Sequence, residues 1–322
     1  MGLTDLGRLL LPCLLFLTGC MATLPERVPE LAGSYRVATR FTHLGVQRSF
    51  LLHLPEQYRP GMPLVVVLHG AFSGARQTEQ ETGFSKLADR EGFLVAYPEG
   101  AGLAGLLQHW NAGFCCGSAQ RNQLDDVGFV AEVIKTVRTR FSADPSRVYL
   151  VGMSNGGMLA YRYAVERPAE LAAVAVVSGA IARSADTVGI SFRLQEPAEA
   201  LPVMIVHGLD DDVIPVSEDM VSDSQARREF APASAAVDFW LRVQGGTAQP
   251  LRTEARNGSV TKTVWLNSHN QMGVAYVQLA GWGHRWPGPW FTDRLEAGHP
   301  LYGFDGTSEI WNFLSGYARS GR

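Results

Sequence analysis

A serine between glycines is the feature of this sequence most suited to covalent chemistry. Residues 152 to 156 read Gly-Met-Ser-Asn-Gly and match the pattern G-x-S-x-G. An apolar stretch leads into the motif, and a stretch with helical spacing leaves it. A sharp turn from a strand into a helix exposes a serine hydroxyl in a strained position, where it can act as a nucleophile. Ser154 is therefore the predicted nucleophile, and a simple strand-to-helix turn is the alternative.

A serine hydroxyl is a weak nucleophile until a base takes its proton, and an acid must hold that base in one tautomer. Among the eight histidines, only His284 lies in a glycine-flanked loop after a late predicted strand. His299 lies in a polar loop and is predicted to be a surface residue. The acid should precede the histidine in the chain. Residues 210 to 212 are three consecutive aspartates after another predicted strand, and spacing alone does not choose among them.

The tetrahedral intermediate of acyl transfer also needs preorganised backbone donors for its oxygen. The sequence His69-Gly70-Ala71 follows the first buried strand and can supply one such donor. We assign the oxyanion hole to the backbone N–H groups of Ala71 and Asn155. His69 itself is expected to have a structural role, as a hydrogen-bonded residue beneath the turn.

Strand and helix patterns alternate along the chain, and this alternation predicts a mostly parallel sheet flanked by helices. The motifs follow predicted strands, so they should meet at the carboxyl edge of the sheet. The expected strands are 63–68, 93–97, 148–151, 173–177, 202–206 and 274–279, and the expected helices lie near 83–90, 126–141, 155–165, 235–243 and 308–318.

Composition excludes several classes of function. The chain has 322 residues with a formal net charge of -3, and it contains no run of Lys or Arg. A nucleic-acid surface needs clustered cations, so no nucleic-acid partner is predicted. Residues 100 to 105 match G-x-G-x-x-G, the dinucleotide fingerprint, but Pro98 and Glu99 separate them from the preceding strand. We therefore expect a flexible loop there, and neither a cofactor nor a metal.

The first residues have the pattern of an export signal. Leu9 to Leu17 form an apolar stretch that is too short to cross a membrane, and it ends in Leu-Thr-Gly-Cys at residues 17 to 20. This ending resembles the lipobox of bacterial lipoproteins, in which the cysteine is acylated. The expected organisation is a signal peptide over residues 1–19, a tether over 20–34 and one catalytic domain over 35–322. Cys20 would anchor an exported protein to a membrane of the cell envelope; a plain secretory peptide is the alternative.

Seven motifs in order carry a resemblance to a known family. They are Leu-His-Gly at 68–70, Trp-Asn-Ala-Gly at 110–113, Cys-Cys-Gly at 115–117, Asp-Asp-Val-Gly-Phe at 125–129, Gly-Met-Ser-Asn-Gly-Gly at 152–157, His-Gly-x-x-Asp at 207–211 and Gly-His-x-Trp-Pro-Gly at 283–288. Together they resemble the polyhydroxybutyrate-depolymerase-like and feruloyl-esterase-like α/β hydrolases, whose members include exported lipoproteins. The resemblance implies the α/β-hydrolase fold over residues 45–318 and a serine esterase activity.

The resemblance also chooses the acid, because Asp211 is the fifth residue of the His-Gly-x-x-Asp string. It further implies that Trp110, the cysteines at 115 and 116, and Asp126 shape the wall of the active site. Their alternatives are a core position for Trp110, packing for the cysteines and a helix N-cap for Asp126. Adjacent cysteines can join only in a strained ring, yet a vicinal disulfide between Cys115 and Cys116 is plausible in an oxidising compartment.

Only roughly twenty residues separate two of the expected strands, from Ile181 to Leu201, which is too few for a large cap domain. We therefore expect an open cleft, with Trp110 and Trp286 available to stack on substrate. The predicted function is hydrolysis of bulky aromatic or polymeric carboxylic esters, of feruloyl or polyhydroxyalkanoate type, through an acyl-enzyme. The same residues would serve an acyltransferase or a peptidase, and a non-catalytic surface binding module is the alternative from another class.

Overall fold

The computed structural model describes residues 33–43, 46–103, 106–183, 192–222, 230–245, 250–255, 258–267 and 271–320. The predicted signal peptide, Cys20 and most of the predicted tether lie outside these residues. The first strand already begins at Gly33, so the expected boundary of the catalytic domain at residue 35 falls inside that strand. No helix among the described residues is long and apolar enough to cross a membrane.

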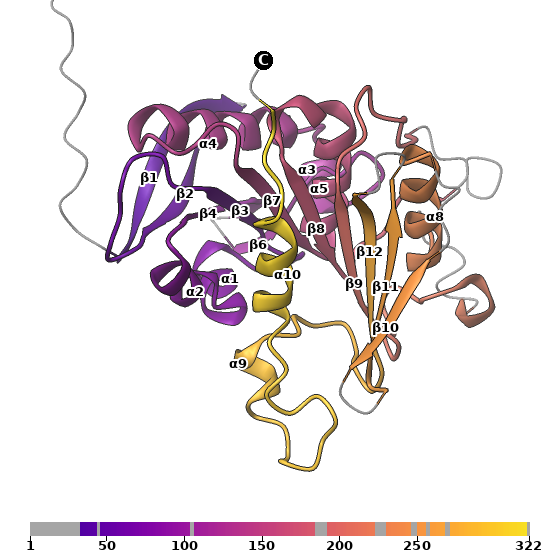
Figure 1. Ribbon diagram of the computed structural model, residues 1–322. Coiled ribbons are helices and arrows are strands. Elements are labelled where there is room, and N and C mark those ends of the chain that lie inside the picture. Colours follow the sequence, from indigo (N-terminus) through magenta and orange to yellow (C-terminus); the bar gives the residue numbers. More distant parts are fainter. Residues whose placement is uncertain are drawn as a thin grey trace, which may run out of the picture.

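A ten-stranded mixed sheet runs through the molecule in the order β1-β2-β4-β3-β7-β8-β9-β12-β11-β10 (Figure 1). Its six central strands, from β4 to β12, are parallel, and antiparallel strands extend both sides. The strands of this sheet are β1 (Gly33–His43), β2 (Val46–Leu54), β3 (Leu64–Leu68), β4 (Leu94–Pro98), β7 (Val148–Met153), β8 (Ala173–Val177), β9 (Val203–Gly208), β10 (Leu251–Ala255), β11 (Val260–Leu266) and β12 (Met272–Leu279).

The central strands are apolar on both faces because helices cover both faces. All five residues of β3 are buried: Leu64, Val66 and Leu68 pack into one core, while Val65 and Val67 pack into the other. This alternation follows from the opposite directions of successive side chains in a strand.

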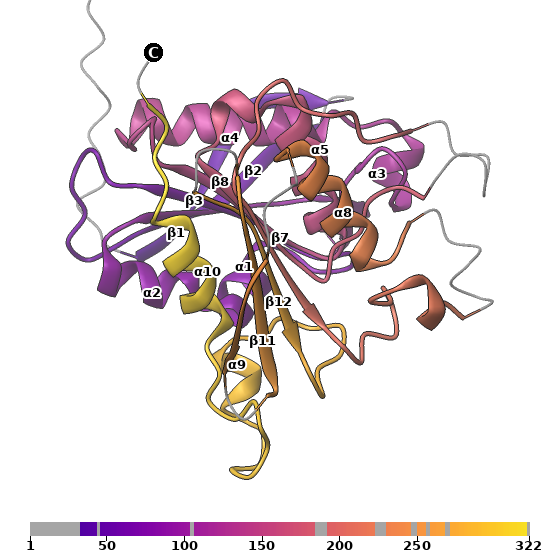
Figure 2. The ribbon, with the colours of Figure 1, turned by 45° about the vertical axis from the view of Figure 1, so that its right-hand side comes forward.

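Helices form a layer on each side of the sheet (Figure 2). The core with Leu64, Val66 and Leu68 contains side chains of α4, α5 and α8, and the opposite core contains side chains of α2 and α10. The described helices are α1 (Ala75–Thr82), α2 (Phe84–Glu91), α3 (Gly117–Arg121), α4 (Asp126–Arg140), α5 (Asn155–Glu166), α8 (Ala233–Val243), α9 (Pro289–Thr292) and α10 (Gly306–Leu314), with 3-10 turns η1 (Pro168–Glu170) and η2 (Glu218–Met220).

Two local expectations are wrong. The glycine-rich stretch from residue 100 is no simple loop, since β5 (Ala101–Leu103) and β6 (Leu106–His109) pair there as a separate antiparallel hairpin. The N-cap of α4 is Asp125, whose carboxylate accepts a hydrogen bond from the N–H of Gly128, and not Asp126. Asp126 is fully buried instead and forms an ion pair with Arg48.

Candidate active site

The predicted nucleophile lies on a strained turn between β7 and α5. Ser154 has φ 51° and ψ -121°, a backbone conformation that is rare for residues other than glycine. The flanking glycines are required by close backbone approach: a Cβ on Gly152 would collide with the carbonyl group of Gly156, and one on Gly156 would collide with the carbonyl oxygen of His69. The turn therefore holds the Ser154 side chain at the carboxyl edge of the sheet.

Three predicted residues from distant parts of the chain meet at this turn. The Nε2 atom of His284 lies 2.9 Å from Ser154 Oγ, and its Nδ1 atom lies 2.8 Å from Asp211 Oδ2. A carboxylate accepts the hydrogen bond at Nδ1, so that nitrogen carries the proton in the neutral ring and Nε2 is free to accept from the serine hydroxyl. This is the arrangement in which a serine, a base and an orienting acid act together.

Asp211 is held by the backbone as well as by the imidazole. Its Oδ1 atom accepts hydrogen bonds from the N–H groups of Val213 and Ile214, at 2.9 and 2.8 Å. Burial raises the pKa of this carboxyl group, but the hydrogen bonds from His284 and the backbone outweigh burial and bring the pKa below its usual value. Asp210 and Asp212 are exposed. The middle aspartate is thus the one that meets the histidine, in agreement with the choice made from the resemblance.

A second histidine lies beneath the acid and has no role in the expectations drawn from the sequence. The fully buried His207 donates from Nε2 to the carbonyl oxygen of Ile214 at 2.7 Å, and the same nitrogen lies 3.4 Å from Asp211 Oδ2. Burial lowers the pKa of this imidazole, so it is neutral at pH 7. It supports the loop that carries Asp211.

The expected oxyanion hole lies next to the serine. A Cβ built on Gly70 would be 3.5 Å from the Cβ of Ser154, so the turn after β3 packs directly on the nucleophile. Ala71 follows Gly70, and Asn155 is the first residue of α5, where N–H groups lack intrahelical partners. Within the described part of the chain, no hydrogen bond occupies the backbone N–H of Ala71 or of Asn155. Both groups are therefore available to a ligand.

The two tryptophans expected to contact substrate do not reach the surface. Trp110 has no exposed area, and Trp286 is 1% exposed. The indole of Trp110 packs against His69 and Phe129, and that of Trp286 contacts Phe84. Neither ring can stack on a sugar or a phenolic group, so this expectation is wrong. The sequence showed an aromatic residue near the site, but not the direction of its side chain.

The structure joins Cys115 and Cys116 in a vicinal disulfide across a cis peptide bond. Both cysteines are partly buried and pack against a small apolar cluster beside the site. That cluster consists of Ala112, Phe114, Met158, Ala180 and Ile214. The pair therefore lies in the wall that surrounds the carboxyl ends of the central strands.

Two exposed apolar side chains lie near the oxyanion hole, one on the turn after β3 and one on β6. Phe72, directly after Ala71, is 67% exposed, and Leu107 is 58% exposed. The N–H of Phe72 donates to the carbonyl oxygen of Gln108 at 2.8 Å, and its ring contacts His109 edge-on. Phe72 and Leu107 both have positive φ angles, which are strained for bulky residues and occur preferentially at functional sites. The sequence signal for Phe72 was an aromatic residue directly after the Gly-Ala turn.

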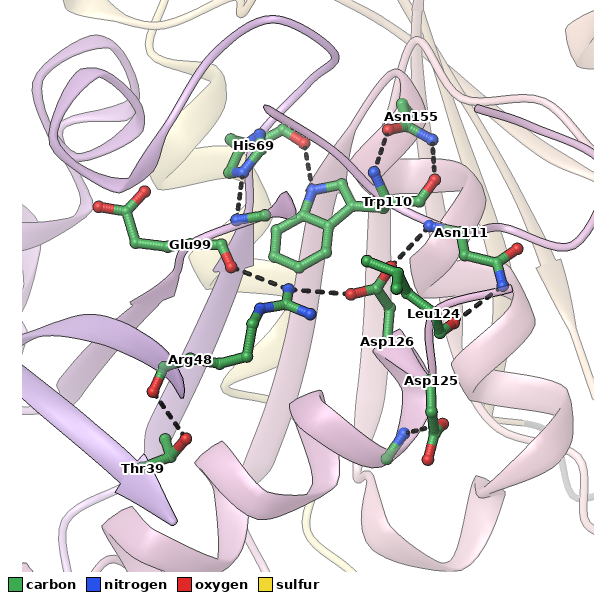
Figure 3. A network of polar contacts seen from close by, with 12 residues as sticks. Thr39, Arg48, His69, Glu99, Trp110, Asn111, Leu124, Asp125, Asp126 and Asn155 are labelled. Carbon is green, nitrogen blue, oxygen red and sulfur yellow. Dashed lines mark hydrogen bonds and ion pairs between the residues drawn. The ribbon is translucent and has the colours of Figure 1, made fainter. Parts of the chain in front are cut away.

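A buried polar network lies behind the site (Figure 3). The Nδ1–H of His69 donates to the carbonyl oxygen of Gly70 at 2.7 Å, and its Nε2 accepts from the N–H of Gly100 at 2.9 Å. These bonds require the neutral ring, and burial lowers the pKa of His69 to about 4. The structural role expected of this residue agrees with its contacts. Asp126, expected in the wall or at a helix cap, belongs to this network.

The fold and the meeting of a serine, a histidine and an aspartate at the sheet edge define a serine hydrolase of the α/β-hydrolase class. The family model described as "Esterase PHB depolymerase" matches residues 48–195. The chain is a carboxylic-ester hydrolase, and over the matched residues it is similar to the polyhydroxybutyrate-depolymerase esterases, as the ordered motifs indicated.

Individual relatives are also named as esterases. NocK of Nocardia uniformis subsp. tsuyamanensis, assigned to the esterases, is 29% identical over 289 residues, which cover 84% of this chain and 79% of NocK. Feruloyl esterase B of Piromyces equi is 27% identical over 224 residues, 69% of this chain but only 39% of that protein. Among solved structures, the acetyl xylan esterase from Aspergillus awamori superimposes with a TM-score of 0.58 at 17% identity, covering 79% of this chain and 94% of that one. The last match shows the shared fold.

Proposed function

We propose that Ser154, His284 and Asp211 are the catalytic residues of this hydrolase and act through a covalent acyl-enzyme. The observation that carries the proposal is the continuous pair of hydrogen bonds from Asp211 through His284 to Ser154, at 2.8 and 2.9 Å. His284 takes the proton of the serine hydroxyl while Oγ attacks the ester carbonyl carbon. Asp211 holds the imidazole in the required tautomer and stabilises the imidazolium that forms.

The oxygen of the tetrahedral intermediate accepts hydrogen bonds from two backbone N–H groups. One belongs to Ala71, in the turn after β3, and the other to Asn155, directly after the nucleophile in the chain. His284 then gives its proton to the leaving alcohol, and the acyl group stays on Ser154. In the second half of the reaction, His284 takes a proton from water, and the resulting hydroxide attacks the acyl carbon. Ser154 leaves with the proton returned by His284, so the enzyme is regenerated and the free acid is released.

For the substrate, we propose esters with a bulky aromatic or polymeric acyl part, of feruloyl or polyhydroxyalkanoate type. Two names from the comparisons support these classes. One relative is a feruloyl esterase, and the matching family model is described as a PHB depolymerase esterase. The exposed Phe72 and Leu107 offer apolar contacts beside the oxyanion hole, a role first expected of two tryptophans. Exposed apolar side chains beside the site suit a substrate that extends over the surface of the protein.

The decisive experiment compares wild type and Ser154→Ala with feruloyl, hydroxybutyrate-oligomer and long-chain lipid esters. Wild type should hydrolyse the first two in preference to the third, and the variant should lose turnover and labelling by a fluorophosphonate while it keeps its thermal midpoint. Hydrolysis by the folded variant would overturn the assignment of the nucleophile. Exclusive turnover of long-chain lipid esters would instead overturn the proposed substrate class. Release of free acid in the presence of added alcohol separates hydrolysis from acyl transfer.

We further propose that the mature protein is an exported lipoprotein, attached to a membrane of the cell envelope through an acylated Cys20. The support is the Leu-Thr-Gly-Cys sequence at the end of a short apolar stretch. Cys20→Ser should release the protein from the membrane fraction, whereas Cys13→Ser, in the discarded peptide, should leave it attached. Recovery of wild type in the soluble exported fraction would contradict lipidation and leave the plain secretory peptide.

A further inference from the structure

We propose that Trp110 is a positioning residue that fixes both backbone donors of the oxyanion hole, and that the buried pair of Arg48 and Asp126 holds the segment of Trp110 in place. This inference rests on the proposed function, because it concerns the same oxyanion hole. It assigns to a ring without exposed area a role in catalysis that needs no contact with substrate.

The first connection runs from Trp110 to the donor at Asn155. The N–H of Trp110 donates to Asn155 Oδ1 at 2.7 Å, and Asn155 Nδ2 donates to the carbonyl oxygen of Trp110 at 3.0 Å (Figure 3). Two hydrogen bonds between one side chain and the backbone of one residue fix distance and orientation together. Asn155 is 1% exposed, so water does not compete for these bonds. The backbone N–H of the same residue is the donor proposed above.

The second connection runs from Trp110 to the donor at Ala71. The indole Nε1–H of Trp110 donates to the carbonyl oxygen of His69 at 2.9 Å, two residues before Ala71. The rings of Trp110 and His69 are also in contact, with centroids 4.7 Å apart. His69 is held in turn by its bonds to Gly70 and Gly100. One residue therefore ties together the turn after β3 and the start of α5.

The segment of Trp110 has its own buried anchor. The N–H of Asn111 donates to Asp126 Oδ2 at 2.7 Å, and Asp126 Oδ1 lies 2.9 Å from Arg48 Nη2. The same Arg48 nitrogen donates to the carbonyl oxygen of Glu99 at 3.0 Å. The Arg48 guanidinium also lies over the ring of Phe129, with Cζ 4.1 Å from the centroid.

A buried ion pair contributes little net stability to a core, because desolvation offsets most of the attraction between the charges. Apolar residues of similar volume often stabilise a core equally well or better. Unlike an apolar residue, a carboxylate at residue 126 accepts a hydrogen bond from the N–H of Asn111. This bond fixes the position of the neighbouring Trp110. We therefore assign the pair to the positioning of this segment.

Position matters at an oxyanion hole because the donors must lie about 2.7–3.1 Å from the developing oxyanion, and loss of one donor costs about 10²–10³ in kcat. A shift of a donor by a fraction of an ångström should cost part of that factor. Since the ground-state ester uses the hole less than the transition state does, the loss should fall on kcat and not on KM.

The central test is Trp110→Phe, which keeps an aromatic ring in the core and removes the hydrogen bond to His69. We expect kcat for a p-nitrophenyl ester, per active site titrated with fluorophosphonate, to fall by about tenfold to a hundredfold with KM nearly constant. Affinity for a trifluoromethyl ketone, which forms a tetrahedral adduct with the serine, should fall by a similar factor. Affinity for the product acid should stay unchanged.

The matched control is Trp240→Phe. Trp240, on α8, is also without exposed area, and its ring packs against Tyr161 of α5. Among the described residues, its indole N–H has no hydrogen-bond partner. This variant should share the packing loss while it keeps kcat and the affinity for the ketone. If Trp110→Phe and Trp240→Phe lose thermal stability equally and both keep kcat within twofold, the positioning role is overturned.

A second variant keeps the test decisive if Trp110→Phe does not fold. Asn155→Ala removes both bonds to the backbone of Trp110 but keeps the backbone donor of residue 155, and it should show the same fall in kcat and in ketone affinity. Unchanged kinetics in this variant would also overturn the inference. Failure of the proposed function would look different, because Ser154→Ala would then retain turnover whatever happened at Trp110.

Discussion

The imidazole of His284 lies between Ser154 and Asp211, and its Nδ1 atom is 2.8 Å from the Asp211 carboxylate. The neighbouring carboxylates of Asp210 and Asp212 are exposed to solvent. A run of three aspartates thus contains one residue that is turned inward, and two backbone N–H groups hold it there. The inward direction, and not the number of acidic residues, determines which of them can orient the base.

From this relationship we predict that Asp211→Asn lowers kcat by about 10⁴-fold, because an amide cannot hold the imidazole in the productive tautomer. Asp210→Asn and Asp212→Asn are controls of the same chemistry, and each should change kcat by less than about threefold. Steady-state kinetics with one chromogenic ester measures all three. Comparable losses in the three variants would contradict the assignment of the acid.

The sequence was sufficient for residues whose position follows from the backbone around them. Ser154 and His284 could be predicted because a strand precedes each of them and glycines flank each of them. Asp211 needed the family resemblance, since its inward direction depends on hydrogen bonds with residues 213 and 214. The direction of Trp110 could not be predicted, because it depends on partners far away in the chain, His69 and Asn155.

Some strands of the fold could be predicted from the sequence and others could not. Strands such as β8, covered on both faces, are continuous apolar runs, and the expected strand 173–177 has the bounds observed. The hairpin of β1 and β2 and the antiparallel strands β10 and β11 have mixed polar patterns and were not predicted. Their pairing is set by partners across the sheet, which a pattern in a single segment does not reveal.

We predict that Phe72→Ala selectively weakens the turnover of bulky substrates. The side chain is 67% exposed beside the oxyanion hole, so its removal deletes an apolar contact and leaves the core intact. An aromatic contact contributes about 0.5–1.5 kcal/mol, which corresponds to a loss of about two- to tenfold in kcat/KM for feruloyl or hydroxybutyrate-oligomer esters. Acetyl esters, too small to reach the ring, should be hydrolysed at the rate of wild type.

Tyr302→Ala provides the control for Phe72, since Tyr302 is another exposed aromatic residue, 45% accessible, on the loop after α9. It should leave kcat/KM unchanged for every ester. An equal loss on acetyl and feruloyl esters in Phe72→Ala would mean that the substitution disturbs the donor at Ala71. Phe72 would then have no role in substrate selection.

For the buried ion pair, we predict that Arg48→Met destabilises the protein by about 3–5 kcal/mol, because it leaves the Asp126 carboxylate buried without a counterion. Burial already raises the pKa of this carboxyl group, and Arg48 is the main group that opposes the rise. The double variant Arg48→Met/Asp126→Asn should recover most of the stability, since a neutral amide still accepts from the N–H of Asn111. Denaturant unfolding measures both. A double variant as unstable as the single one would show that the charge is not the cause.

The last prediction concerns acid stability and His69. Its two hydrogen bonds require the neutral ring, and burial lowers its pKa to about 4 from 6.5. The unfolded chain therefore binds a proton at this residue between about pH 6.5 and pH 4 while the folded chain does not, so the free energy of unfolding falls as the pH falls through this window. At the lower end of this window, His69 has lowered the free energy of unfolding by about 3 kcal/mol, because each unit of pKa corresponds to about 1.4 kcal/mol.

His69→Gln should flatten that part of the dependence on pH, since a glutamine side chain can still accept from the N–H of Gly100 but does not titrate. Unfolding in urea at pH 7, 5.5 and 4 measures the difference between the variant and wild type. His299→Gln replaces a partly exposed histidine outside this network and should keep the slope of wild type. If His69→Gln loses stability on acidification as steeply as wild type does, the acid sensitivity arises elsewhere, and the buried His207, whose pKa is also lowered, becomes the residue to replace.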